Sequence, residues 1–140
     1  MKEKLYLLLK KVLIFLHFFI ALNAIPAGLA FVIKPGGELM QMQKMEFKIP
    51  LFTDFLIPGL VLLLVIGVGQ LLTAIGFVRK YRNQLLFSLV SALILLVWIV
   101  VQIALLGFNS WLQPFIFCIG LTQLLLWVLL KRAISKHLII

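Results

Sequence analysis

The chain has 140 residues, of which 64% are hydrophobic and 12% are charged, and its mean hydropathy is +1.23. A small soluble domain has too much surface to hide so many apolar side chains, so the composition excludes an ordinary soluble enzyme. The net charge is +9, from 13 Lys and Arg against 4 Asp and Glu. A basic chain can indicate nucleic acid or an anionic membrane surface as a partner.

Three long segments carry no charge: residues 12–33, 55–78 and 83–130, which are 22, 24 and 48 residues long. About 20 apolar residues cross a bilayer as a helix, so the first two segments hold one span each and the third holds two. Residues 107–111 (GFNSW) supply the break, because Gly and Asn favour turns and Trp suits the membrane interface. We predict an all-α membrane protein with one domain over 1–140, a four-transmembrane-helix bundle with spans at 12–33, 54–78, 84–106 and 111–130.

The basic residues fall mostly on one side of this topology. They lie before span 1, between spans 2 and 3 and after span 4, whereas the other side has equal numbers of Lys and of Asp and Glu. The positive-inside rule therefore predicts cytoplasmic N and C termini. A groove that binds nucleic acid would gather these residues in one patch, so we expect no nucleic-acid partner. The ten residues on the basic side are Lys2, Lys4, Lys10, Lys11, Arg79, Lys80, Arg82, Lys131, Arg132 and Lys136.

Two interpretations of the basic side remain open. The residues can simply set the orientation of the helices, which the positive-inside rule alone explains. They can also bind anionic headgroups of the lipid bilayer, since each basic residue near an anionic leaflet contributes about 1 kcal/mol. The residues expected at headgroups are Arg79, Lys80, Arg82, Lys131 and Arg132.

The only sizeable loop follows span 1 and runs from residue 34 to 53. Apolar and charged residues alternate weakly in its second half, which predicts a short extended outer loop. Met40, Met42 and Met45 lie within six residues of one another. Thioethers are soft ligands that select Cu(I), so one hypothesis is an outer-face copper site. The alternative is that these residues are flexible apolar filler at the interface.

Polar residues inside the spans recur at helical spacing. His17 lies on a stripe with Ala21, Ala24 and Gly28, and Gln70 and Gln102 lie on comparable stripes of spans 2 and 3. One hypothesis is a ligand cavity lined by His17, Gln70 and Gln102. The alternative is that they hold the helices together, as small and amide side chains do in membranes. The span 3 stripe is Ser88, Ser91, Leu95, Trp98 and Gln102.

The chain has no recognisable catalytic motif. It lacks a phosphate-binding loop, a zinc-protease motif, a nucleophile elbow and paired carboxylates. Cys118 is the only cysteine, which excludes an internal disulfide. We therefore expect neither an enzyme nor a cofactor.

Residues 50–59 (PLFTDFLIPG), 98–103 (WIVVQI) and 110–114 (SWLQP) resemble segments of small, uncharacterised bacterial four-span integral membrane proteins. The resemblance extends from span 1 to span 4. It implies a multi-pass protein of the bacterial inner membrane, and it brings no catalytic residues.

Three functions fit these observations. The first is an accessory protein that binds lipid or another membrane protein. The second is a small transporter or channel, which would need a homo-oligomer because four helices can pack without a pore. The third is soft-metal binding by the methionine loop.

Overall fold

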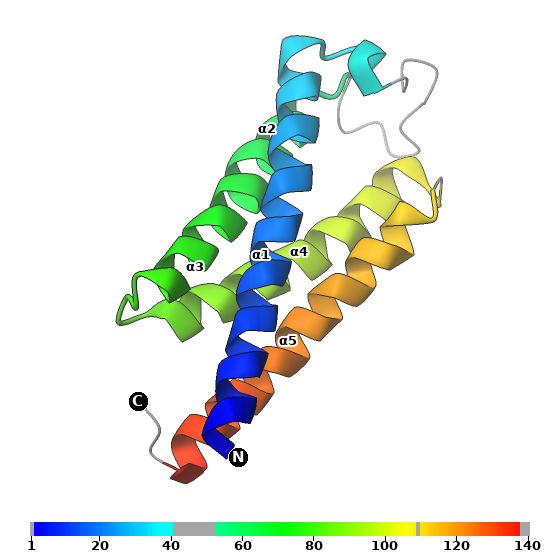
Figure 1. Cartoon of the computed structure of the whole chain (residues 1–140). Coiled ribbons are helices and arrows are strands. Elements are labelled where there is room, and N and C mark those ends of the chain that lie inside the picture. Colours follow the sequence, from blue (N-terminus) through cyan, green and yellow to red (C-terminus); the bar gives the residue numbers. More distant parts are fainter. Residues whose placement is uncertain (1, 41–52, 109, 138–140) are drawn as a thin grey trace.

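The computed structural model describes residues 2–40, 53–108 and 110–137. Every regular element in these ranges is helical, and the helices pack side by side as an elongated bundle (Figure 1). In chain order the elements are α1 (Lys2–Ile33), η1 (Glu38–Met40), α2 (Leu56–Leu60), η2 (Val61–Val68), α3 (Gly69–Val78), α4 (Gln84–Leu106) and α5 (Leu112–His137).

Four helices are long and apolar enough to cross a membrane: Lys2–Ile33, Leu56–Val78, Gln84–Leu106 and Leu112–Ser135. The second of them comprises α2, the π-helical segment η2 and α3 without interruption. The four long apolar helices expected from the uncharged segments are confirmed. The first and last helices extend beyond their predicted spans into the segments that carry basic residues.

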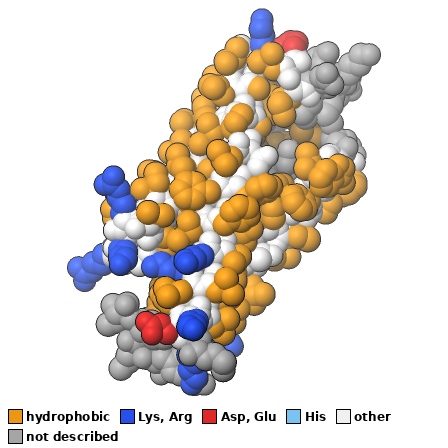
Figure 2. Space-filling view, in the orientation of Figure 1, with side chains coloured by type: hydrophobic (Ala, Val, Ile, Leu, Met, Phe, Trp, Pro, Cys, Tyr) orange, Lys and Arg blue, Asp and Glu red, His pale blue; other side chains and the backbone are white. Residues whose placement is uncertain are grey.

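The two ends of the bundle differ in charge. The end that holds residues 34–40, 53–55 and 107–108 is called the loop end here. The opposite end, with Lys10, Lys11, residues 79–82 and Lys131, is called the basic end. Figure 2 shows Lys and Arg gathered toward the basic end and a broad apolar band between the two ends. Such a band is what the hydrocarbon layer requires of a protein that crosses it.

Local hydrogen bonds start the second span at the loop end. The carboxylate Oδ1 of Asp54 accepts the backbone N–H of Leu56 at 3.0 Å, and Pro58 stands in the first turn, where it removes no helical hydrogen bond. The Phe55 N–H donates to the Pro35 carbonyl at 2.8 Å, which ties this start to the end of α1. The Phe31 and Phe55 rings stack with their centroids 5.0 Å apart.

At the basic end, α3 stops in a Schellman motif. The Tyr81 N–H donates to the Gly76 carbonyl at 2.8 Å and the Lys80 N–H to the Phe77 carbonyl at 3.3 Å. Lys80 occupies the left-handed position of the motif with φ of 56°, where Gly is the usual residue. The chain then turns directly into α4.

Glycines let α1 approach the second span closely. A Cβ on Gly28 would lie 2.5 Å from the backbone nitrogen of Leu63, and one on Gly59 would lie 2.6 Å from Cβ of Phe31. The Gly28 stripe expected in span 1 is confirmed, because His17, Ala21, Ala24 and Gly28 are all buried. Its partner in the region of closest approach is η2.

The buried face of α4 differs from the predicted stripe. Ser88 and Leu95 are buried as expected, but the stripe continues through Ala92, Ile99 and Leu106. Trp98 and Gln102 are only half-buried and lie to one side of it. The reason is that α4 packs mainly against α5 along its length and against α3 near the basic end, and touches η2 only lightly.

The predicted extended loop cannot be compared, because residues 41–52 lie outside the described residues. The part that is described forms the short 3₁₀ helix η1, which places Met40 at the loop end with its side chain exposed.

Candidate functional site

A chain of polar side chains joins all four spans within the bundle. It begins at His17 of α1, which is 0% exposed. The imidazole Nδ1 is hydrogen-bonded to Oε1 of Gln70 on α3, and Nε2 lies 2.9 Å from Oγ of Ser88 on α4. An amide oxygen only accepts hydrogen bonds, so Nδ1 carries the proton and Nε2 accepts the Ser88 hydroxyl. This arrangement suits a neutral imidazole with both nitrogens satisfied.

The amides of Gln70 and Gln123 form a reciprocal pair. Nε2 of Gln123, on α5, donates to Oε1 of Gln70 at 3.1 Å, and Nε2 of Gln70 lies 3.4 Å from Oε1 of Gln123. The Gln70 amide also donates to the Ser91 carbonyl at 3.3 Å. Both glutamine side chains are at most 1% exposed. Gln70 is therefore the central member, in contact with α1, α4 and α5.

A second branch joins α3 to α4. The hydroxyls of Thr73 and Ser91 lie 2.6 Å apart, and the Thr73 hydroxyl also lies 2.9 Å from the Gly69 carbonyl. The ring of Phe77, one turn further along α3, stacks on the His17 imidazole with centroids 6.3 Å apart. The name polar network is used below for His17, Gln70, Thr73, Ser88, Ser91 and Gln123.

The buried polar atoms of the polar network have hydrogen-bond partners. Within the described residues, the only buried side-chain nitrogen or oxygen without a hydrogen-bond partner is Oε1 of Gln84, which is not a member. Unpaired polar groups cost several kcal/mol in hydrocarbon, so a network with its members paired can stay in the membrane interior without water. These hydrogen bonds hold the four helices together.

The structure brings together two of the three residues singled out from the sequence. His17 and Gln70 are hydrogen-bonded, but Gln102 lies 14 residues beyond Ser88 on α4, which is about 21 Å of helical rise. Gln102 lines a small hollow of about 30 Å³ at the loop end, together with Phe31, Phe55 and Trp98. A single cavity lined by all three residues is thus not formed.

Ser88 and Gln123 are network members that the sequence interpretation did not pair with His17. The sequence does contain a signal for them, which is the distance along each helix from the nearest basic residue. His17 and Ser88 each come six residues after a basic residue, Lys11 and Arg82, while Gln70 and Gln123 precede Arg79 and Lys131 by nine and eight. At 1.5 Å of rise per residue, all four lie about 9–14 Å from the basic end.

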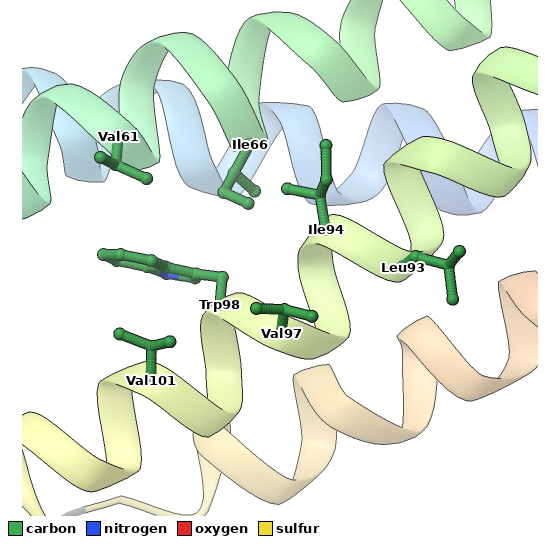
Figure 3. A pocket seen from close by; sticks show the side chains of 7 residues that line it. All are labelled: Val61, Ile66, Leu93, Ile94, Val97, Trp98 and Val101. Atoms are coloured by element: carbon green, nitrogen blue, oxygen red, sulfur yellow. The ribbon is translucent and has the colours of Figure 1, made fainter.

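An apolar groove opens on the side of the bundle between η2 and α4. Its volume is about 270 Å³, and its lining includes Val61 and Ile66 of η2 and Leu93, Val97, Trp98 and Val101 of α4. In Figure 3 the Trp98 ring lies across the groove between Val61 and Val101. Trp98 also lines the small hollow that contains Gln102, so the two spaces meet at this side chain.

The predicted headgroup residues lie at the basic end. Arg79 and Lys80 follow the end of α3, Arg82 precedes α4, and Lys131 and Arg132 lie in the last turns of α5. All five side chains are exposed. Nζ of Lys131 lies 5.6 Å from the centre of the Trp127 ring, whose Nε1 donates to the Leu85 carbonyl at 2.8 Å.

The copper hypothesis stays a prediction. Met40 is described, but Met42 and Met45 lie outside the described residues. Among the residues that are described, no group of three or more His, Cys, Asp or Glu is placed to hold a metal ion. Cys118 is free and exposed on the surface of α5. No family model, curated protein or solved structure matches the chain.

Proposed function

We propose that this chain is a non-catalytic integral membrane protein that acts by binding lipid or another membrane protein on its surface. The observation that carries the proposal is the pairing of the interior polar groups with one another. The interior side chains form hydrogen bonds to side chains of neighbouring helices, as His17, Gln70 and Gln123 do. The groove between η2 and α4 opens sideways instead, toward the hydrocarbon.

The proposal includes an orientation and a location. The basic end faces the cytoplasm of a bacterial cell, so that both termini are cytoplasmic and the loop end is on the outer side of the inner membrane. Exposed basic side chains support this orientation, because they lie where anionic headgroups of the cytoplasmic leaflet would be. They are Arg79, Lys80, Arg82, Lys131 and Arg132.

Cysteine labelling in intact cells tests the orientation. Single cysteines are placed in residues 34–40 and at 82; the loop residues should react with a membrane-impermeant maleimide and residue 82 should not. The native Cys118 is changed to Ser in these variants.

Two measurements test the function itself. The protein is extracted with its surrounding membrane in polymer nanodiscs, and mass spectrometry identifies the lipids and proteins that remain with it. It is also reconstituted in liposomes, and the leak of protons, potassium and a small fluorescent solute is measured against empty vesicles. We expect a specific lipid or protein companion and no leak.

A saturable flux of any of these solutes would overturn the proposal in favour of the transporter or channel. Such flux would require a homo-oligomer, because the interior of the single bundle is filled by the polar network and its apolar neighbours. The oligomeric state is measured in the same nanodiscs.

A further inference from the structure

Lys10 differs from the other basic residues in the direction that it faces. It precedes Leu13 and His17 by three and seven residues, so it continues the face of α1 that packs into the bundle. Its side chain is half-buried, whereas every other Lys or Arg whose side chain the structure describes is exposed. The positive-inside rule requires charge near a helix end, but it does not require that the charge face inward. Orientation alone therefore does not explain this position.

The charge that acts on Lys10 has the same sign. The ammonium of Lys10 lies close enough to that of Lys80 for the two charges to repel each other. Lys80 comes from the turn after α3, where its backbone has φ of 56° and Gly is the usual residue. Neither lysine forms an ion pair within the described part of the chain. Two adjacent cations without an acidic partner indicate a site for an anion.

The nearest acidic residue along α1 does not fill this role. Among the acidic residues that the structure describes, only Glu3 belongs to the basic end. It precedes Lys10 by seven residues, which is about 10 Å of helical rise. A carboxylate that forms an ion pair lies within about 4 Å of its partner. The anion that neutralises Lys10 and Lys80 therefore comes from outside the described residues.

The depth of the two lysines indicates where the anion comes from. Ile33, the last residue of α1, follows Lys10 by 23 residues, which is about 35 Å of rise. The hydrocarbon layer is about 30 Å thick. With Ile33 at one border of this layer, Lys10 lies just outside the other border, at the level of lipid phosphates. Figure 1 shows α1 continuing past the turn between α3 and α4, so the site is at the side of this helix.

Apolar side chains on both sides of Lys10 favour a ligand that belongs to the membrane. Leu5 and Leu8, on its N-terminal side, are 55% and 57% exposed, and Leu13 on the other side packs against Phe77 of α3. Figure 2 shows basic side chains at this level with apolar side chains both above and below them. Exposed leucines at this level are stable in the interfacial layer of a bilayer. A phospholipid places its phosphate and its acyl chains in this layer together.

We propose that Lys10 and Lys80 bind the phosphate of one anionic phospholipid from the basic-end leaflet. A phosphodiester has two unesterified oxygens that share its negative charge, so each ammonium donates to one of them. The bound phosphate relieves the repulsion between the two lysines. This inference rests on the proposed function and names the class of lipid and the place where it binds.

The test compares two neighbouring lysines of α1. Lys10→Gln removes the half-buried charge, and Lys11→Gln removes the same charge from the next position, which is exposed. Both variants lower the net charge by one, so general attraction to anionic lipid falls equally in both. Each protein is purified in mild detergent with equal amounts of phosphatidylglycerol and phosphatidylcholine. Native mass spectrometry then measures the ratio of the two lipids that remain bound as a single molecule.

We expect the wild type to prefer phosphatidylglycerol and Lys11→Gln to stay within about twofold of it. Lys10→Gln and Lys80→Gln should each lower the preference about tenfold, which corresponds to about 1.4 kcal/mol. Lys10→Arg keeps the charge and should retain most of the preference. The double variant of Lys10 and Lys80 should lose less than the product of the two single losses, because both lysines hold one phosphate.

Three results would overturn the site. Equal losses in Lys10→Gln and Lys11→Gln would show only general attraction to the basic end, and the proposed function would then stand on the companions found in nanodiscs. Displacement of the lipid by an equal concentration of inorganic phosphate would identify a soluble anion as the ligand. Retention of no phospholipid, or no preference for the anionic one, by the wild type would refute the site. If nanodiscs also hold no lipid or protein companion, the proposed function fails with it.

Discussion

The two halves of this bundle use their polar residues in opposite ways. In the half toward the basic end, His17, Gln70 and Gln123 meet in a network that joins all four spans. In the half toward the loop end, Gln102 and Trp98 lie beside a groove and have no hydrogen bond to other described residues. A glutamine thus joins two helices at one depth, as Gln123 does, and has no hydrogen bond to other described residues at another depth, as is the case for Gln102.

The cause of the difference is the direction of α4. Near the basic end α4 packs against α3, and the network forms between them. Farther along, α4 stays with α5, while α1 and η2 hold each other through their glycines. The space left between η2 and α4 is the groove. The comparison shows that the depth of a polar residue along its helix, as well as the helix face on which it lies, decides whether it finds a hydrogen-bond partner within the bundle.

The largest expected effect comes from removing the histidine of the network. His17→Ala leaves a cavity and takes away a partner of both Gln70 and Ser88, so we expect unfolding free energy to fall by about 2–4 kcal/mol. The measurement is reversible unfolding in bicelles with a steric trap. Phe15→Ala is the control, because Phe15 is 63% exposed on the same helix. A loss no greater than that of Phe15→Ala would show that the network does not stabilise the bundle.

The close approach of α1 and η2 gives the next effect. A Cβ at Gly28 would meet the Leu63 backbone at 2.5 Å, so Gly28→Ala must push the helices apart and should cost about 1–3 kcal/mol. Gly69 offers a matched control, since a Cβ there meets nothing within 4 Å. Gly69→Ala should be neutral or stabilise the helix by about 0.5–1 kcal/mol. Unfolding in the same bicelles measures both, and equal effects would contradict the predicted contact.

The sequence predicted much of the frame and less of the site. Three uncharged segments, the third of them broken at residues 107–111, are sufficient to predict four helices. The stripe from His17 to Gly28 follows from periodicity alone. Periodicity gives only the rotation of a residue about its helix, which is why Gln102 was grouped with His17 although about 21 Å of rise separates it from Ser88. The π-helical segment η2 (Val61–Val68) has no sequence signal, although it is the element that α1 contacts most extensively.

The turn at the basic end predicts a smaller effect of the opposite sign. Lys80 has φ of 56°, a conformation that costs a residue with a Cβ about 1–2 kcal/mol. Lys80→Gly should therefore raise the unfolding free energy by about 0.5–1 kcal/mol, after the greater entropy of Gly in the unfolded chain is deducted. Lys80→Ala, which also loses the charge but keeps the Cβ, is the control. If both variants behave alike, the charge and not the backbone governs this position.

The smallest effect is expected at Gln102, and its contrast with Gln123 separates the two halves most directly. Gln102→Leu and Gln123→Leu replace the same amide with the same apolar side chain, one beside the groove and one in the network. Gln123→Leu leaves Gln70 without its reciprocal partner and should cost about 1–2 kcal/mol. Gln102→Leu breaks no hydrogen bond to the described residues, so delipidated protein should change by less than about 0.5 kcal/mol. Unfolding of both variants in lipid-free detergent measures this contrast. A loss at Gln102 equal to that at Gln123 would mean that Gln102 stabilises the bundle itself, which would contradict the difference between the two halves.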